Sequence, residues 1–214
     1  MEFRTKEEQV ADYLREGIIA GRFARGARLK QQEIAQMLNT SITPVREALK
    51  LLEAEGYVSG GNYRGAVVAP FDIEASQEVL ELRVQLETRL VRGAVERATA
   101  QDVADLKVLA AEFANAHAAG DNEGARAANY RFHHRMFEAA RMPQTLHFVQ
   151  ILWARYPFDL INRLQGRVSR AAEEHDDMLD AIIAGDSAAA MLATRQHIEA
   201  GWQELRDSLE KQQG

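Results

Sequence analysis

The chain has 214 residues, of which 46% are hydrophobic and 27% are charged, and its formal net charge is −6 at pH 7. This composition is that of an ordinary soluble globular protein of one or two domains. The absence of cysteine excludes disulfides and cysteine chemistry, and the charged N-terminus and short apolar runs predict a cytoplasmic protein with no membrane contact.

The charge is divided unevenly along the chain. Residues 1–70 hold ten Lys and Arg against nine Asp and Glu, a net of +1, whereas residues 71–214 hold sixteen against twenty-three, a net of −7. Salt screens exposed charges beyond about 8–10 Å, so the local balance governs contact with a phosphate backbone. We expect two domains, residues 1–70 and residues 71–214, and the first is not too acidic to bind DNA.

Three helices and a β-hairpin are predicted in residues 1–70. An amphipathic helix ends at Gly21, and a second covers "QQEIAQMLN". The third is expected to begin near Thr43, a good N-cap residue, with Pro44 at the first helical position. The runs "YVS" and "AVVA" flank a Gly- and Asn-rich turn, which predicts a hairpin. This order of elements is typical of a winged helix-turn-helix.

Long helices are predicted after Pro70. The helix-boundary signals there are "TAQD", "AGDN", "MPQ", "QGR" and "AGDS". The expected fold class is mainly α, with an N-terminal winged helix-turn-helix and a C-terminal all-α bundle of six helices. The six helices are expected at about 72–98, 100–119, 123–140, 144–164, 168–184 and 187–211.

The third predicted helix has features of a DNA-recognition helix. Arg46 is expected in its first turn, where the helix dipole disfavours a cation and bound DNA would offset that cost. Arginine can pair with guanine or with phosphate, and Lys50 lies one turn further along the same face. A solvated arginine near Glu47 is the alternative, and this helix alone leaves the two balanced. The flanking helix and the predicted wing favour the DNA-binding interpretation.

The segment "LREGIIAGRFARGARLKQQEIAQMLNTSITPVREALKLLEAEGYV", followed by "RGAVV", resembles the winged-helix domain of GntR-family bacterial transcription regulators. The resemblance covers residues 7–69 and includes the elements "L-x-x-x-I-x-x-G" and "S-x-T-P-V-R-E-A-L". It implies binding to a palindromic double-stranded operator. The residues that it implies at the DNA are Arg28, Thr43 and Arg46, with Arg64 and Gly65 near the minor groove at the wing tip.

Two positions depart from the family pattern. Arg25 stands where proline is usual, which makes it a candidate phosphate contact. Ile42 stands where arginine is usual, which removes a base contact. Isoleucine cannot hydrogen-bond to a base but can touch a thymine methyl group. Packing at the start of the helix is the alternative role for Ile42.

Asn129 and three of the six histidines form a candidate metal site. Asn129 and His133 are four residues apart and so share one helical face, while His175 and His197 fall on two later helices. Three imidazoles and an oxygen donor can converge on a divalent metal in a bundle core, leaving positions open for water or ligand. Spacing alone is weak support, since scattered histidines are more often surface or core residues.

The segments "NYRFHHRMF", "EEHDDMLDAIIAGDSAAA" and "MLATRQH" resemble motifs of the FCD domain, the all-helical ligand-binding domain of the FadR subfamily. The resemblance runs from about residue 73 to residue 208. It implies that the metal, Zn or Ni, is bound by Asn129, His133, His175 and His197. Because Asn is neutral, the metal keeps more positive charge than an Asp would leave it, which favours a small carboxylate effector. The other histidines, His117, His134 and His147, are expected to be structural or exposed.

Arg83, in "LELRVQLE", matches the start of the same domain. By the resemblance it points into the effector pocket, where it would bind a carboxylate through two hydrogen bonds. A salt bridge with Glu87 is the equally weighted alternative. The family also implies a homodimer, whose two-fold symmetry presents two recognition helices to a palindromic operator.

The function predicted from these features is a transcription regulator, and no enzyme. Its operator affinity would be controlled by a small organic acid at the metal site, with repression as the sign common in the family. One alternative is a metal-free regulator that senses a bulkier acyl ligand. Another is a three-histidine metalloenzyme, which is disfavoured because no catalytic motif such as H-E-x-x-H accompanies the histidines.

Overall fold

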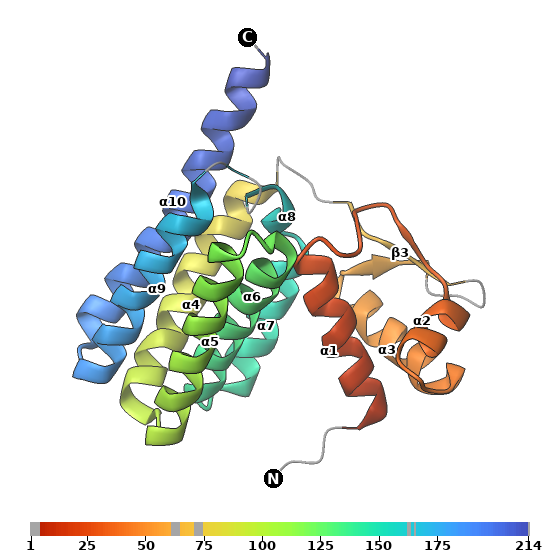
Figure 1. Ribbon diagram of the computed structural model, residues 1–214, viewed down its shortest axis with the longest axis horizontal. Coiled ribbons are helices and arrows are strands. Elements are labelled where there is room, and N and C mark those ends of the chain that lie inside the picture. The colour runs from red at the N-terminus through yellow and green to blue at the C-terminus, as the bar shows by residue number, and fades with distance from the viewer. Residues whose placement is uncertain (1–4, 61–64, 71–74, 162–163, 165, 214) are drawn as a thin grey trace.

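The structure is a computed structural model that describes residues 5–60, 65–70, 75–161, 164 and 166–213. A helical bundle and a smaller winged-helix unit lie side by side, and helix α1 (Lys6–Ile19) lies between them (Figure 1). Helix α1 begins with a capping box, in which Thr5 and Glu8 exchange hydrogen bonds between side chain and backbone. Helix α1 packs against α3 (Ile42–Glu55) on one side and against α6 (Asn122–Ala139) on the other.

The winged-helix unit contains a small antiparallel sheet of strand order β1-β3-β2. Val58 of β2 pairs with Val68 of β3, as the predicted hairpin requires, and Arg28 of β1 pairs with Val67 on the other edge. Strand β1 was not predicted, because two residues are too few to show an alternating pattern. The remaining elements of this unit are β1 (Arg28–Leu29), α2 (Gln31–Met37), α3 (Ile42–Glu55), β2 (Val58–Ser59) and β3 (Ala66–Val68).

Helix α3 begins earlier than predicted. Ser41 is its N-cap residue, with φ −82° and ψ 165°, so Ile42 and Thr43 are already helical. The expectation that Thr43 is the cap is therefore wrong. Proline is tolerated throughout the first helical turn, where backbone N–H groups have no partner within the helix, and Pro44 does not have to mark the first position. Arg46 consequently lies just beyond the first turn.

The described part of the helical domain contains seven helices where six were expected. The prediction of one continuous helix over 144–164 is wrong, because the helix is interrupted between α7 and α8. Pro157 explains the break, since proline lacks an N–H group and its ring clashes with the carbonyl four residues earlier. The helices are α4 (Ser76–Arg97), α5 (Ala100–Ala118), α6 (Asn122–Ala139), α7 (Pro143–Ala154), α8 (Phe158–Ile161), α9 (Arg167–Ala184) and α10 (Ser187–Gln213).

One apolar core runs from the winged-helix unit into the bundle. Leu14 and Leu52 on the winged-helix side and Phe132 and Met136 in the bundle all belong to it, and each is fully buried. Because interfaces between domains are mostly more polar and mobile, this shared apolar core implies a fixed docking of α1 on the bundle. Across the described residues, no helix has both the length and the hydropathy needed to cross a membrane.

Candidate metal centre and DNA interface

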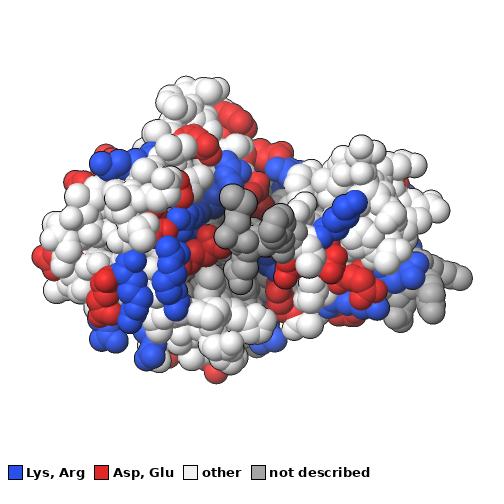
Figure 2. All heavy atoms as spheres, turned by 90° about the horizontal axis from the view of Figure 1, so that it is seen from below, with Lys and Arg blue, Asp and Glu red and all other residues white. Residues whose placement is uncertain are grey.

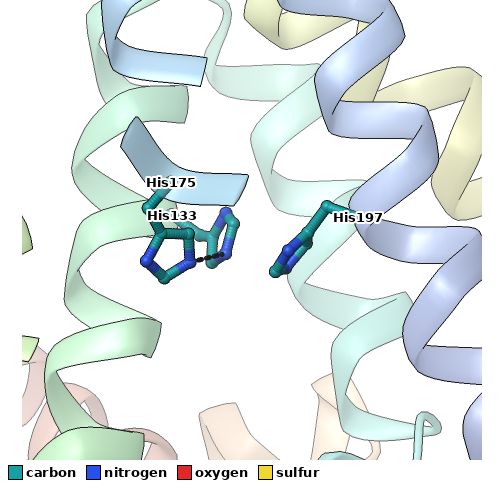
Figure 3. Close-up of side chains that lie close together, drawn as sticks. All are labelled: His133, His175 and His197. Carbon is teal, nitrogen blue, oxygen red and sulfur yellow. Dashed lines mark hydrogen bonds between the residues drawn. The ribbon is translucent and has the colours of Figure 1, made fainter. Parts of the chain in front are cut away.

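Three histidines from three different helices point toward a common space (Figure 3). His133 lies on α6, His175 on α9 and His197 on α10, and their potential ligand atoms all lie within 4.8 Å of one another. The Nε2 atoms of His133 and His175 are 3.1 Å apart. Two nitrogen ligands at the usual 2.0–2.1 Å from one zinc ion would be about 3.0–3.4 Å apart, so this spacing suits a shared metal.

Burial keeps these imidazoles neutral, which is the form that binds metal. His133 and His175 are 7% and 1% exposed. Burial, reinforced by the neighbouring His197, lowers the pKa of each well below its usual value. Burial also lowers the pKa of His197, against the opposing hydrogen bond to Glu174. The ring of Phe132 stacks on His175 with centroids 4.5 Å apart, which fixes that imidazole and keeps water away from it.

Asn129 completes the predicted set of ligands. It lines the same cavity as His133 and His197. Its Oδ1 atom is buried and, among the described residues, accepts no hydrogen bond; the Nδ1 atoms of His133 and His175 are likewise unpartnered. A buried polar atom without a partner costs roughly 1–3 kcal/mol, so the unpartnered Oδ1 atom of Asn129, in a cavity that His133 and His197 also line, indicates a place for a ligand. The donor set, one neutral oxygen and three neutral imidazoles, fits a divalent transition metal.

Glu174 and Arg167 support the site, although the sequence analysis gave neither a role. The Glu174 carboxylate lies 2.6 Å from Nδ1 of His197 and accepts bonds of 2.9 and 2.7 Å from the buried Arg167 guanidinium. Burial would raise the pKa of Glu174, but its hydrogen bonds with His197 and Arg167 lower it to about 2. An anionic partner on one ring nitrogen orients the imidazole and makes the other nitrogen a better ligand. The sequence shows only that Glu174 directly precedes His175. This adjacency does not predict the contact between Glu174 and His197.

A cavity adjoins the histidines and gives small molecules room to reach them. Its volume for the centres of water-sized molecules is about 40 Å³. Ile19 of α1 lines it, so the winged-helix unit contributes to its wall. Arg83, Trp153, Tyr156 and Arg167 also line the cavity.

Arg83 lies at the cavity and forms the ion pair considered as its alternative role. It lines the cavity, as the family resemblance implied, and it is only 4% exposed. It also forms the alternative salt bridge, in which its Nε and Nη2 atoms donate to Glu87 at 2.6 and 3.3 Å. The indole of Trp153 donates to the same carboxylate at 2.8 Å. Arg83 is thus a neutralised, fixed group at the cavity wall.

Of the predicted DNA-contacting residues that the structure describes, Thr43, Arg46 and Lys50 lie on α3, Arg28 lies on β1, and Gly65 directly precedes β3. Arg46 is half-buried, and its Nε atom has no hydrogen-bond partner within the described chain. Lys50, which is exposed, forms a 2.9 Å ion pair with Glu47. Thr43 and Arg28 are also exposed. The space-filling view from below shows acidic and basic side chains interspersed over both units (Figure 2). On this face the basic side chains of the described residues form no continuous patch.

At the wing, Gly65 is required by the sheet itself. Its φ is +100°, and a Cβ atom there would lie 2.3 Å from the backbone oxygen of Leu29 on the neighbouring strand. Glycine avoids both the strained conformation and the clash. Arg64, the other predicted wing residue, lies outside the described residues.

Arg25 is placed differently from the expectation that it contacts phosphate. Its Nη1 atom donates to the carbonyl oxygens of Ala69 and Ala154 at 3.1 and 3.0 Å, and its Nη2 atom donates to that of Tyr156 at 3.1 Å. The guanidinium therefore joins the end of the winged-helix unit to the break between α7 and α8. The expectation is wrong because the donors of Arg25 are used at the interface between the two units.

The remaining histidines have structural or exposed roles, as predicted. His134 lies 2.9 Å from the side-chain amide of Gln150, and His117 lies 2.9 Å from the Ser169 hydroxyl. His147 is exposed on α7. None of these three belongs to the metal-competent cluster found among the described residues.

A winged helix-turn-helix fixed to a helical domain with a buried polar cavity defines the class of DNA-binding transcription regulators. The chain belongs to the GntR family with an FCD domain. Residues 6–68 match the family described as "Bacterial regulatory proteins, gntR family", and residues 78–200 match the FCD domain. The family is one of regulators and not of enzymes, which confirms that expectation and removes the metalloenzyme alternative.

The relatives share this class. The chain is 31% identical over 160 residues to the HTH-type transcriptional regulator McbR of Escherichia coli (strain K12), covering 72% of each chain. It is 28% identical over 213 residues to the Exu regulon transcriptional regulator of the same organism, covering 90% of this chain and 81% of the relative. The solved structure of E. coli McbR/YncC has a TM-score of 0.82 at 26% identity and covers 97% of this chain and 100% of its own.

Proposed function

We propose that this protein is a cytoplasmic regulator whose operator affinity is controlled by a small carboxylate bound at a divalent metal, zinc or nickel. Asn129, His133, His175 and His197 hold the metal. A homodimer presents two α3 helices to a palindromic operator and represses transcription until the carboxylate binds. A bound divalent ion would supply an open coordination position for a carboxylate oxygen.

The observation that carries this proposal is the convergence of three buried, neutral imidazoles beside an unpartnered amide oxygen. A core that needed only packing would not gather four polar side chains and leave the amide oxygen of Asn129 without a partner. The carboxylate of Glu174, which is held on His197, adds the outer partner that metal-bound histidines usually have.

The size of the cavity favours a small ligand over a bulky acyl chain. A water molecule needs about 10–15 Å³ of this kind of volume, so 40 Å³ holds about three waters or a few non-hydrogen atoms. Arg83 and Arg167 are each neutralised by an ion pair with a glutamate. The four metal ligands are themselves neutral, so a bound divalent metal would keep its positive charge and attract an anion.

Metal content of protein purified without a histidine tag tests the site directly. We expect about one divalent ion per chain in the wild type and in His147→Ala, which removes an exposed histidine, and none in His175→Ala. Operator binding would be measured on a duplex that the wild-type protein selects from random sequences. We expect carboxylates to weaken binding by the wild type and His147→Ala only. An unchanged carboxylate response in metal-free His175→Ala would contradict the metal model and support a metal-free sensor.

A further inference from the structure

Tyr156 lies at the break between α7 and α8, and its two ends have different neighbours. Its ring lines the cavity beside the histidines. Its backbone carbonyl oxygen accepts a hydrogen bond from Arg25 of the winged-helix unit. A single residue therefore spans the distance from the effector cavity to the DNA-binding unit.

The hydroxyl of Tyr156 has the properties of a ligand-binding group. Tyr156 is 1% exposed, and its hydroxyl has no hydrogen-bond partner within the described residues. Buried tyrosine hydroxyls usually find a partner, so an unpartnered hydroxyl on a residue that lines a cavity indicates a place for a ligand. Burial raises the pKa of Tyr156 to about 12, against the opposing effect of Arg83, so the group stays protonated and can donate.

The surroundings of this ring favour an anion. The Arg83 guanidinium carbon lies 4.0 Å from the centroid of the Tyr156 ring, and Arg83 also lines the cavity. A carboxylate that enters from the metal side would meet a hydroxyl donor beside the guanidinium of the Arg83–Glu87 ion pair. Hydrogen bonds from such donors to a charged acceptor are stronger than neutral ones.

The backbone of the same segment is held by the winged-helix unit. Pro157 interrupts the helix between α7 and α8, so the Ala154 carbonyl has no helical partner in the structure, while the Tyr156 carbonyl accepts from the Phe158 backbone at 2.9 Å. Arg25 donates to both, and it also donates to Ala69, directly after strand β3. A second bond, from the Tyr57 hydroxyl to the Gln150 carbonyl at 2.9 Å, ties the winged helix to α7. Movement of the Tyr156 segment therefore changes the bonds that seat the winged helix.

We propose that Tyr156 is an effector-binding residue whose hydroxyl donates to the bound carboxylate, and that Arg25 transmits the resulting shift of the 154–156 segment to the winged helix. This inference rests on the proposed function, because it requires a carboxylate in the cavity. A ligand can shift the equilibrium between two arrangements of a regulator only if it makes different contacts in each. The Tyr156 hydroxyl and the hydrogen bonds of Arg25 supply contacts that can differ in this way.

The test compares Tyr156→Phe and Arg25→Lys with the wild type. Arg22→Lys is the matched control, because Arg22 also bridges the two units, through a 2.7 Å ion pair with Glu123. The probes are Zn²⁺ and a panel of acetate, lactate, malonate and citrate, from which the carboxylate that most raises the wild-type melting temperature is carried forward. Trp153 lines the cavity, so its fluorescence reports carboxylate binding. Anisotropy of the selected duplex reports operator affinity.

Tyr156→Phe is expected to weaken carboxylate binding about tenfold or more. Its Zn²⁺ affinity and its operator affinity without carboxylate should stay as in the wild type. Arg25→Lys is expected to bind the carboxylate as the wild type does, while the ratio of operator affinities with and without carboxylate falls toward one. Coupling is reciprocal, so the operator should also lose its effect on carboxylate affinity in this variant. Arg22→Lys should keep the full ratio.

Three outcomes would overturn the inference. If Tyr156→Phe binds the carboxylate as tightly as the wild type does, the hydroxyl does not contact the carboxylate. If the ratio of operator affinities with and without carboxylate is the same in Arg25→Lys as in the wild type, Arg25 does not connect the cavity to the winged helix. In both cases the wild-type response, and with it the proposed function, would stand. A wild type that binds none of the carboxylates would overturn both. If Arg25→Lys fails to fold by circular dichroism, Arg25→Gln carries the same measurement.

Discussion

Glu174 and His197 form a 2.6 Å hydrogen bond. Both oxygens of the Glu174 carboxylate also accept hydrogen bonds from the buried Arg167 guanidinium. The chain thus fixes the imidazole of His197 from outside before any metal is bound. A ring held in this way loses little freedom on binding an ion, and its free nitrogen is directed toward His133 and His175 (Figure 3). The arrangement makes Glu174 the first residue to test beyond the ligands.

Replacing Glu174 with glutamine keeps the shape and removes the charge. We expect the metal dissociation constant of Glu174→Gln to rise about 10–100-fold, since outer partners of metal-bound histidines contribute this much. Competition with a chromogenic chelator measures the change. Glu173→Gln is the matched control, because Glu173 is adjacent but exposed. Equal metal affinity in Glu174→Gln and the wild type would show that the contact with His197 does not support a metal.

Arg46 on α3 is the predicted base or phosphate contact, and its Nε atom is buried without a partner in the described part of the chain. We expect Arg46→Ala to weaken operator binding by about 1–3 kcal/mol and to relax sequence preference if the contact is to a base. Anisotropy titrations on the selected duplex and on scrambled DNA distinguish a contact with a base from a contact with phosphate. Arg92→Ala, which removes an exposed arginine from α4, should bind as the wild type does. If the two variants bind alike, α3 does not read the operator through Arg46.

Ile42 is the first helical residue of α3 and is 37% exposed, so it is available to a base. We expect Ile42→Arg to change the base preferred at one position in each half-site, because arginine pairs with guanine while isoleucine can only touch a thymine methyl group. Selection of duplexes from random sequence by each protein gives the preference directly. The same selected sequence from both proteins would assign Ile42 to packing.

Asp102 anchors α5 to α6 and to the turn after it. Its buried carboxylate accepts from the Thr99 backbone at 2.7 Å and from Arg141 at 2.8 Å, and it also pairs with Arg135. Although burial opposes ionisation, these bonds lower the pKa of Asp102 well below its usual value. A carboxylate with a lowered folded-state pKa adds stability that is present above about pH 4 and lost as the pH falls below it.

We therefore expect Asp102→Asn to lower the free energy of unfolding by about 2–3 kcal/mol at pH 7. The difference from the wild type should shrink as the pH is lowered from 5 toward 2, because the wild-type carboxylate then becomes protonated. Urea unfolding at several pH values measures this. Asp105→Asn is the control, since Asp105 also pairs with Arg135 but its side chain is 38% exposed, whereas that of Asp102 is buried. A difference that persists undiminished at low pH would mean that the ionised form of Asp102 is not what stabilises the fold.

The sequence by itself determined the class of this protein and the identity of most of its site. Helical periodicity and capping signals are local, because they depend on residues three or four positions apart. They placed Asn129 and His133 on one face and separated the histidines onto three helices. The family motifs added His175, His197 and Arg83. The error at 144–164 was local as well, since Pro157 stands in the printed sequence.

Only the tertiary structure decided which residues surround that site and how it is connected to the winged helix. The bond from Arg25 to Tyr156 joins residues 131 positions apart, and the bond from Glu174 to His197 joins residues 23 positions apart on different helices. No spacing rule links such pairs, because their approach depends on how whole helices pack. Packing turned Arg25 from a candidate DNA contact into a link between the units and placed Tyr156 among the residues that line the cavity.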